Sequence, residues 1–367
     1  MSTRRSFLKK SILGVPAILQ ADVRQLVEPE SLGVAILGLG RYAEGWVAPA
    51  VAQSRYTHVA GIITGSPNKV EKWQSKYSIP DGNVYSYGEM DQIAKNDAID
   101  VVYVVTPPGT HADFTIRALE AGKHVICEKP MAVSTEECDR MIEVARRNQR
   151  MLQIGYRLYW DPWNVRVMTA MREKEFGAGW TSLDTRVSFN IKSIEPDHWM
   201  LNPSLCLGGA LSEVGVYAVQ AAIYSSQELP IAVRAKSWTD RPELFSAVSE
   251  HWEWELEWSR GRTSTHFASL GRDTCVELKM TLPKGELFLD NAYNYDGQTL
   301  VTPQGQESFT HIFQQKRQVE GQALAILGRH PVLTPGEMGR RDLYVLESVR
   351  QSAQSGEVVS LDQYRYY

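Results

Sequence analysis

A glycine-rich turn between an apolar run and a helical segment constrains the fold of this chain more than any other feature. Gly38, Gly40 and Ala43 have the spacing GxGxxA and directly follow the apolar run Leu32–Leu37. The first glycine permits a tight turn and the second lets the backbone approach a pyrophosphate. Ala43 allows close packing of helix on strand, and the helix N-terminus favours an anion. The turn therefore predicts a dinucleotide-binding βα unit.

The chain continues in the same pattern up to about residue 157. Strand-like apolar runs alternate with helical segments, and one of these helices opens with a capping box, Ser134 followed by Glu137. Such alternation is typical of a doubly wound parallel α/β sheet. We expect residues 31–157 to form a Rossmann domain, with strands at 32–37, 59–63, 101–105, 124–127 and 151–156 and helices at 42–52, 67–76, 110–121 and 134–148.

After residue 158 strand-like segments follow one another directly, which predicts a large, mostly antiparallel open sheet in an α+β domain. We expect residues 158–367 to bind substrate and to mediate oligomerisation. Trp252, Trp254, Leu256 and Trp258 alternate with glutamates, so this strand has one aromatic face. That face is buried either within the chain or at a subunit interface. The open sheet predicts a homo-oligomer, a dimer or a tetramer. Expected strands are 181–189, 231–238, 251–258, 263–270, 274–282 and 285–289; expected helices are 164–174, 209–225, 311–327 and 335–355.

Residues 1–30 resemble a twin-arginine export signal, with Arg4 and Arg5 before a Phe-Leu step. The apolar stretch that follows, residues 12–19, is too short to span a bilayer. We therefore expect export to the periplasm and no membrane span. The alternative is a disordered basic head on a cytosolic enzyme.

The net charge is -4, and basic residues form no long stripe, which argues against a nucleic-acid partner. The four cysteines form no CxxC pair, and the eight histidines show no ligand spacing. We expect ordinary thiols and no metal site.

The segment after the second strand favours NADP over NAD. NAD-binding proteins place an acidic residue there for the ribose 2′-hydroxyl, but no Asp or Glu occurs between Glu44 and Glu71. Thr64, Gly65, Ser66 and Lys69 lie there instead. Hydroxyl groups and a cation suit a 2′-phosphate. Alternatively, Lys69 is a solvated helix residue and the cofactor choice stays open.

Four longer segments carry a family resemblance. They are GLGRYA at 38–43, AGKHVICEKPM at 121–131, GYRLYWDPWN at 155–164 and GGALSEVGVY at 208–217. With these four segments, the chain resembles the Gfo/Idh/MocA oxidoreductases over about residues 30–360. Within that family it resembles the periplasmic glucose–fructose (aldose–aldose) oxidoreductase type.

The resemblance implies a catalytic pair. Lys129 would reach both the nicotinamide ribose and the substrate, and Tyr217 would be the acid/base at the reacting hydroxyl. A nearby ammonium favours a phenolate, so the pair is chemically competent. Glu213 stands where the family commonly has Asp and is assigned a supporting catalytic role, or else is a helix-surface carboxylate. Trp199 would stack on a sugar ring or pack the domain junction.

The resemblance also extends the cofactor site. Thr106, Pro107 and His111 resemble the loop on the nicotinamide side. Tyr87 and Arg157 match positions that contact the nucleotide, although Arg157 could pair with a carboxylate instead. The full expected cofactor set is Gly38, Gly40, Arg41, Tyr42, Ala43, Thr64, Gly65, Lys69, Tyr87, Thr106, Pro107, His111, Glu128, Lys129 and Arg157.

The function expected from these features is NADP-dependent oxidoreduction of sugar CH–OH groups. Because an exported enzyme meets little soluble NADP, we expect tightly bound cofactor and ping-pong transfer between two sugars. The main alternative is a redox glycoside hydrolase, which oxidises a hydroxyl transiently and releases an aglycone. A non-catalytic NADP-binding sensor is a third reading, against which the Lys129–Tyr217 pair argues.

Overall fold

The computed structural model describes residues 31–362 and Tyr364. The expected twin-arginine segment, residues 1–30, lies outside the described residues, so export stays a prediction. No helix in the described part of the chain is both long and apolar enough to cross a bilayer.

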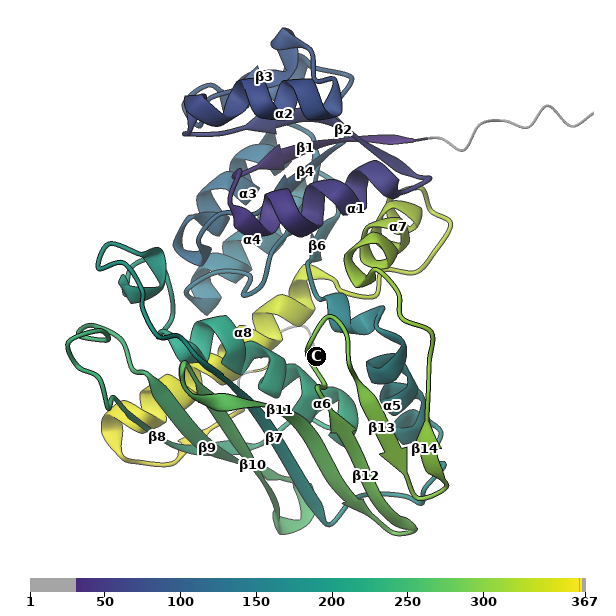
Figure 1. Ribbon diagram of the computed structural model, residues 1–367, viewed down its shortest axis with the longest axis vertical. Helices are drawn as coiled ribbons and strands as arrows, with labels where there is room; N and C mark the ends of the chain where they lie inside the picture. Colours follow the sequence, from purple (N-terminus) through teal and green to yellow (C-terminus); the bar gives the residue numbers. More distant parts are fainter. Residues whose placement is uncertain (1–30, 363, 365–367) are drawn as a thin grey trace, which may run out of the picture. The chain divides into compact units, whose positions relative to one another are not determined.

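The first half contains a six-stranded sheet in which every neighbouring pair is parallel (Figure 1). Its strands are β1 (Leu32–Leu37), β2 (Thr57–Ile63), β3 (Val84–Tyr85), β4 (Val101–Val104), β5 (His124–Cys127) and β6 (Leu152–Ile154). The order β3-β2-β1-β4-β5-β6 confirms the expected doubly wound sheet. The strand order reverses between β1 and β4, where open α/β sheets bind ligands at the carboxyl ends of the strands.

Four helices of this half connect the strands: α1 (Ala48–Gln53), α2 (Val70–Tyr77), α3 (His111–Glu120) and α4 (Thr135–Arg147). Ser134 caps α4 as its capping box predicts, because its hydroxyl accepts a hydrogen bond of 3.2 Å from the Glu137 amide. The helix expected at 42–52 is not regular. A π-helical turn, Ala43–Val47, precedes α1. Pro49 cannot donate to the turn before it, which accounts for a wider turn at this point.

The second half contains a nine-stranded sheet of order β14-β13-β12-β11-β7-β10-β9-β8-β15. All neighbours are antiparallel except β7 and β10, which confirms the expected mostly antiparallel sheet. Its strands are β7 (Ser182–Asn190), β8 (Ala232–Trp238), β9 (His251–Trp258), β10 (Arg262–Ser269), β11 (Gly271–Leu282), β12 (Gly285–Asp290), β13 (Thr299–Thr302), β14 (Gly305–Glu307) and β15 (Val359–Ser360).

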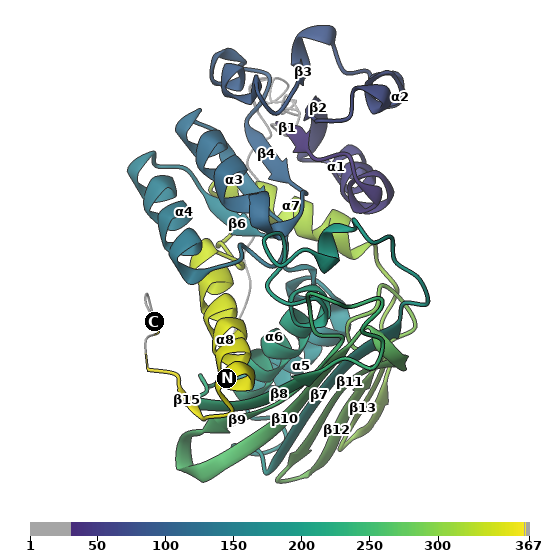
Figure 2. The same cartoon turned by 90° about the vertical axis from the view of Figure 1, so that its left-hand side faces the viewer.

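Three helices, α5 (Pro162–Arg172), α6 (Val216–Ser226) and α8 (Gly336–Ser355), lie on one face of this sheet (Figure 2). They cover the aromatic stripe of β9. Trp254 and Trp258 are 1% and 0% exposed, whereas Glu253, Glu255 and Glu257 on the same strand are exposed. The stripe is therefore core within the chain, not a subunit interface. Trp238 of β8 and Phe267 of β10 are half-buried and lie 6.3 Å apart between ring centroids, and the expected homo-oligomer stays a prediction.

One late helix returns to the first sheet. Helix α7 (Gln314–Ile326) places Val319 and Ala323 in the same apolar cluster as Val34 of β1 and Val47. Residues far beyond position 158 thus complete the core of the nucleotide-binding half. The domain boundary at residues 157 and 158 stays a prediction. The four cysteines, all within the described residues, form no disulfide.

Candidate active site

A cleft of about 690 Å³ opens at the carboxyl ends of β1, β4 and β5, next to the helix that carries Tyr217. It brings together most of the residues singled out from the sequence. Those that line it are Gly38, Gly40, Arg41, Tyr42, Ala43, Lys69, Tyr87, Thr106, Pro107, Glu128, Lys129, Trp199, Glu213 and Tyr217, with Leu39, Ser66, Val105, Pro108, His198, Met200 and Tyr295.

The glycine turn forms one wall of this cleft. Gly38 has φ +96°, and a Cβ there would lie 2.7 Å from the carbonyl oxygen of Val105, so the turn needs glycine at this position. A Cβ on Gly40 would meet nothing within 4 Å. Ala43 is fully buried under the turn. The space above Gly40, at the start of a helix, fits the pyrophosphate of a dinucleotide.

The segment after β2 lies beside this turn. Lys69 donates a hydrogen bond of 2.7 Å from Nζ to the carbonyl oxygen of Leu39, so its ammonium is held against the glycine turn. Ser66 also lines the cleft. Thr64 is buried and does not line the cleft. Its hydroxyl oxygen accepts a hydrogen bond of 3.0 Å from the Ser66 amide. Gly65 faces the Tyr87 ring, which would lie 2.8 Å from a Cβ at that position.

His111 lies behind the loop that follows β4. Its Nδ1 is 3.0 Å from the carbonyl oxygen of Pro130, and its Nε2 is 2.7 Å from that of Thr106. Burial lowers the pKa of His111 to about 4, although these carbonyl contacts oppose the shift. The imidazole therefore ties together the loops after β4 and β5 and does not itself reach the cleft.

Lys129 joins the two halves of the chain. Its Nζ donates a hydrogen bond of 2.9 Å to the carbonyl oxygen of Glu213 and lies 3.6 Å from Oε1 of the same residue. It also lies 4.9 Å from the ring centroid of Tyr217. Burial alone would lower the pKa of Lys129, but the negative charges of Glu213, Tyr217 and Glu128 outweigh it and raise the pKa above its usual value. The amine therefore stays charged.

Glu213 and Tyr217 are four residues apart on one helix, which places them on the same side. The helix begins with a π-helical turn, Leu211–Gly215, and becomes regular at Val216. Glu213 belongs to that turn, and its backbone carbonyl receives the lysine. Irregular turns of this kind are frequent at functional sites. The Tyr217 ring is nearly parallel to the Tyr293 ring, at 6.1 Å between centroids.

Glu128 is a buried carboxyl group under the cleft. Its Oε1 accepts a hydrogen bond of 2.8 Å from the Tyr103 hydroxyl, and its Oε2 accepts one of 3.2 Å from the Lys129 amide. Burial raises its pKa to about 7, while the Tyr103 hydrogen bond and the charge of Lys129 oppose the rise. Its side chain packs directly on Gly155, where a Cβ would come within 2.4 Å of Oε1.

Two residues near Tyr217 differ from expectation. Arg157 does not line the cleft: it is buried behind Tyr217 and Tyr295, with its guanidinium 5.1 Å and 4.4 Å from their ring centroids. Tyr295 lines the cleft but was missed. It lies in the loop between β12 and β13, and its ring stacks on Trp46 at 4.2 Å. No local pattern marks this loop, because only the tertiary fold brings it to the glycine turn.

Trp199 lines the cleft, and its contact with substrate stays a prediction. His198 and Met200 flank it in the chain and line the cleft as well. The His198 and Trp199 rings are 5.6 Å apart. His198 could not be assigned to the site from the sequence, because only its position next to Trp199 distinguishes it there.

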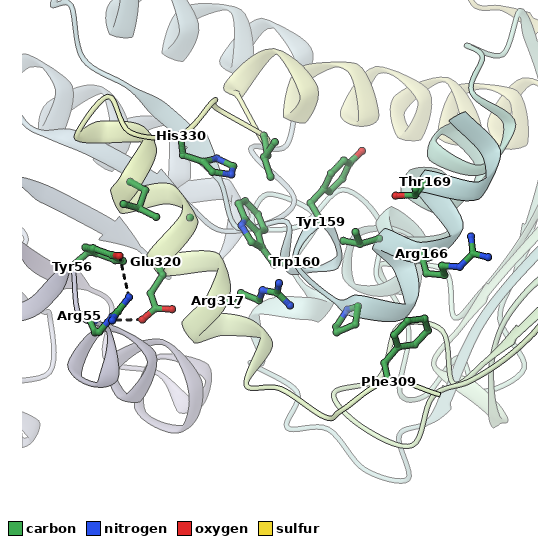
Figure 3. A pocket seen from close by; sticks show the side chains of 15 residues that line it. Arg55, Tyr56, Tyr159, Trp160, Arg166, Thr169, Phe309, Arg317, Glu320 and His330 are labelled. Carbon is green, nitrogen blue, oxygen red and sulfur yellow. Dashed lines mark hydrogen bonds between the residues drawn. The ribbon is translucent and has the colours of Figure 1, made fainter. Parts of the chain in front are cut away.

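A second cleft of about 690 Å³ lies elsewhere, between α5 and α7 (Figure 3). Aromatic side chains line much of it, including Tyr159, Trp160 and Phe309. At one end of it the Arg55 backbone amide donates to Glu320 Oε1 at 3.4 Å and the Arg55 guanidinium donates to the Tyr56 hydroxyl at 3.3 Å, as the dashed lines in Figure 3 show. It contains neither the glycine turn nor the lysine–tyrosine pair, so the first cleft is the candidate active site.

Comparison with known proteins agrees with this geometry. Residues 32–156 match the family described as an oxidoreductase family with an NAD-binding Rossmann fold, GFO_IDH_MocA. The structure of the aldose-aldose oxidoreductase from Caulobacter crescentus, complexed with glycerol, is 33% identical. It superposes with a TM-score of 0.86, and the match covers 90% of this chain and 100% of that one. The chain belongs to the Gfo/Idh/MocA oxidoreductase family.

Curated relatives of this Gfo/Idh/MocA chain include enzymes that act on sugars. The D-xylose 1-dehydrogenase [NADP(+)] of Haloarcula marismortui is 24% identical over 334 residues, which is 89% of this chain and 92% of that protein. The D-xylose 1-dehydrogenase (NADP(+)) 2 of Haloferax volcanii is 25% identical over 334 residues, 89% and 99% of the two chains. The chain is thus an NAD(P)-binding Rossmann oxidoreductase whose relatives include sugar dehydrogenases.

Proposed function

We propose that this chain is an NADP-dependent oxidoreductase of sugar CH–OH groups, which passes hydride from one sugar to another with one tightly bound cofactor. The observation that carries the proposal is the placement of Lys129 and Tyr217. Lys129 Nζ lies 4.9 Å from the Tyr217 ring, in the same cleft as Gly38 and Gly40. An acid/base and a cation thus adjoin a turn that fits a dinucleotide.

The cleft contains groups suited to each part of NADP. Gly38, Gly40 and the helix start would hold the pyrophosphate. Arg41, Ser66 and Lys69 would hold the 2′-phosphate, and no carboxylate occurs between Glu44 and Glu71 to repel it. The nicotinamide, when bound, accepts hydride from a sugar carbon or returns it.

Residues of the protein take up and return the proton of the sugar hydroxyl group. Oxidation of an alcohol requires removal of the hydroxyl proton as hydride leaves, and Tyr217 Oη is the atom proposed to take it. Lys129 stays charged and stabilises the phenolate. Only one Lys129 N–H is donated to the Glu213 carbonyl, so the ammonium keeps donors for a sugar hydroxyl. Glu213 holds the ammonium in place, and Trp199 offers an aromatic face to a sugar ring.

The sugar-to-sugar cycle depends on the proposed location. We propose export through the twin-arginine route to the periplasm, where little soluble NADP is available for exchange. A cofactor reduced by one sugar would then be reoxidised in place by a second sugar. The likeness to an aldose-aldose oxidoreductase supports this reading. We also propose a homo-oligomer, a dimer or a tetramer, that uses the sheet face left open by α5, α6 and α8. Its mass in solution, measured by light scattering, tests this.

The function is tested on the purified protein without added cofactor. We expect a nicotinamide spectrum in the protein as isolated, reduction of that nicotinamide by one member of an aldose panel, and reoxidation by a second sugar after the first is removed. Cofactor-free protein that needs stoichiometric NADP would contradict tight binding. Release of the leaving group from an aryl glycoside, with no net change of cofactor, would instead indicate a redox glycosidase.

A further inference from the structure

Arg157 is a buried cation that the proposed chemistry does not yet use. It lies directly after β6 in a short 3-10 turn, Arg157–Tyr159, and is only 3% exposed. A charge at such a depth is costly unless other groups compensate for it. The groups around the Arg157 guanidinium therefore indicate which negative charge it stabilises.

No hydrogen-bond partner of Arg157 among the described residues is a carboxylate. Nη1 donates to Gln314 Oε1 at 2.5 Å and to the carbonyl oxygen of Asn294 at 3.3 Å, and Nη2 donates to the carbonyl oxygen of Tyr293. The guanidinium also hydrogen-bonds the side chain of Tyr217. Among residues 31–362 no carboxylate forms an ion pair with it. Asp161 is reached only through Gln314, whose Nε2 donates to Asp161 Oδ1 at 2.9 Å.

Three phenols lie near the guanidinium, those of Tyr217, Tyr295 and Tyr42, and its charge also acts on the carboxyl groups of Glu128 and Asp161. Tyr217 has Arg157 on one side, 5.1 Å from its ring centroid, and Lys129 Nζ at 4.9 Å. Burial alone would lower the pKa of Arg157, but negative charge on Tyr217 and Tyr295 raises it, so the guanidinium is charged. The titratable and charged groups that face Tyr217 are Tyr42, Lys129, Arg157, Glu213, Tyr293 and Tyr295.

Tyr295 is a second phenol close to the guanidinium, and burial disfavours its ionisation. Burial, together with the charge of Tyr217, raises the pKa of Tyr295 to about 12 even though Arg157 and Lys129 oppose the rise. Tyr295 therefore stays neutral at working pH. Arg157 also holds the loop that carries Tyr295, through the carbonyl oxygens of Tyr293 and Asn294.

We propose that Arg157 is a positioning residue for Tyr217: its buried guanidinium, which forms no ion pair with a carboxylate of the described residues, stabilises negative charge on Tyr217 Oη, and it does not bind the nucleotide. The inference rests on the proposed function, in which Tyr217 takes the hydroxyl proton. Arg157 itself neither gains nor loses a proton in this role, because a guanidinium stays charged. Two cations, Lys129 and Arg157, thus share the stabilisation of one phenolate.

The test follows the ionisation of Tyr217 directly. Protein labelled with carbon-13 at the tyrosine ring carbon that bears the hydroxyl is titrated by NMR, and the Tyr217 signal is assigned by its loss in Tyr217→Phe. Arg157→Gln is expected to move the titration midpoint of this signal to higher pH by about 1 to 2 units, since removal of a nearby cation disfavours the phenolate. Arg157→Lys keeps a cation and is expected to move it much less.

Cofactor affinity and the pH profile separate this role from nucleotide binding. The pH dependence of kcat/KM for sugar oxidation is expected to shift in Arg157→Gln in the same direction as the NMR midpoint. The Kd of NADP is expected to stay within about twofold, less than the loss of one charged contact would cause. An unmoved Tyr217 signal, or a large loss of NADP affinity with an unchanged pH profile, would overturn the proposal.

A second variant covers the case in which Arg157→Gln does not fold. Gln314→Glu leaves Arg157 in place but sets a carboxylate at the oxygen that the guanidinium already contacts. A proton shared between the new carboxylate and Asp161, whose pKa burial raises, replaces the hydrogen bond of the amide donor. The guanidinium stays charged, but a carboxylate in direct contact offsets its charge, and the Tyr217 midpoint is therefore expected to move to higher pH. A folded Gln314→Glu protein with an unmoved midpoint would also overturn the proposal.

Failure of the proposed function would look different. A wild-type protein that oxidises no aldose refutes the proposed function. The NMR titration needs no turnover, and it would still report whether Arg157 acts on Tyr217.

Discussion

At the residue scale, the site consists of a few charged groups whose ionisation depends on burial. The motif residues Lys129, Glu213 and Tyr217 could be singled out from the sequence because each lies in a recognisable segment, and the structure brings them together. Arg157 was also singled out, but its surroundings could not be inferred, because they come from Tyr293, Asn294 and Gln314, more than a hundred residues away. Tyr295 was missed for the same reason.

Glu128 gives a prediction for stability against pH. Its pKa is about 7 in the folded protein, against 4.5 for an ordinary glutamate, so the folded state holds this proton more tightly than the unfolded chain. Its contribution to stability is therefore greatest at low pH and falls as the pH rises between these two values. Wild type loses this contribution as the pH rises, and Glu128→Gln does not. The unfolding free energy of the variant minus that of wild type is therefore expected to increase by on the order of 2 kcal/mol from about pH 5 to about pH 8.

Denaturant unfolding of both proteins at the two pH values, in the same cofactor state, measures this difference. A stability difference between variant and wild type that is independent of pH would show that Glu128 is ionised throughout.

Lys69 gives a prediction for cofactor choice. Its ammonium lies against the glycine turn, where we expect the 2′-phosphate. Lys69→Met is expected to raise the Kd of NADP about tenfold or more, the value of one charge-assisted hydrogen bond, and to leave the Kd of NAD nearly unchanged. Fluorescence titration with both cofactors measures this. Lys72→Met in α2, the helix that begins directly after Lys69, is the control, since Lys72 is exposed and pairs with Glu44. An equal loss for NAD and NADP would contradict a role at the 2′-phosphate.

At the scale of elements, the sequence predicts most strands and helices because their apolar periods are long. The short strands β3, β13, β14 and β15 were not predicted: each has only two to four residues, too few for a pattern. The two π-helical turns were also not predicted. Both lie at the start of helices that line the candidate site, Ala43–Val47 and Leu211–Gly215.

The glycine turn offers a matched pair of substitutions. Gly38→Ala is expected to lower the free energy of unfolding by about 1 to 3 kcal/mol, because φ is +96° and the new Cβ would clash with the Val105 carbonyl. Gly40→Ala meets no protein atom within 4 Å and is expected to leave stability nearly unchanged. It is expected to weaken NADP binding about tenfold, because its methyl group would lie where the pyrophosphate approaches.

Thermal or denaturant unfolding, together with NADP titration, separates the two effects. Strong NADP binding by Gly40→Ala would mean that the cofactor does not approach this turn.

At the scale of the whole molecule, the two sheets and most of the helices could be predicted from the sequence. The contacts between the two halves of the chain could not. The alternation of tryptophan and glutamate in β9 established a two-faced strand, but only the helices α5, α6 and α8 decide that the tryptophan face is internal. Likewise, no sequence pattern indicates that α7 completes the core of the first sheet. These arrangements depend on tertiary packing, which cannot be inferred from the local periodicity of the sequence.

The contact between the halves also carries the central claim. Lys129 comes from the end of β5 in the first half, and Glu213 and Tyr217 come from the second, so the proposed acid/base pair forms only when both halves are folded and joined. The proposed function therefore requires the whole unit, not the nucleotide-binding half alone.

The most direct measurement compares wild type with Lys129→Met, both loaded with NADP, when each is mixed with the aldose that wild type oxidises. We predict equal NADP affinity within a few fold. Nicotinamide reduction, followed by absorbance, is expected to be slower in the variant by about 10² to 10⁴-fold, the contribution of a positioned acid–base group. Reduction by Lys129→Met at the wild-type rate would contradict the account.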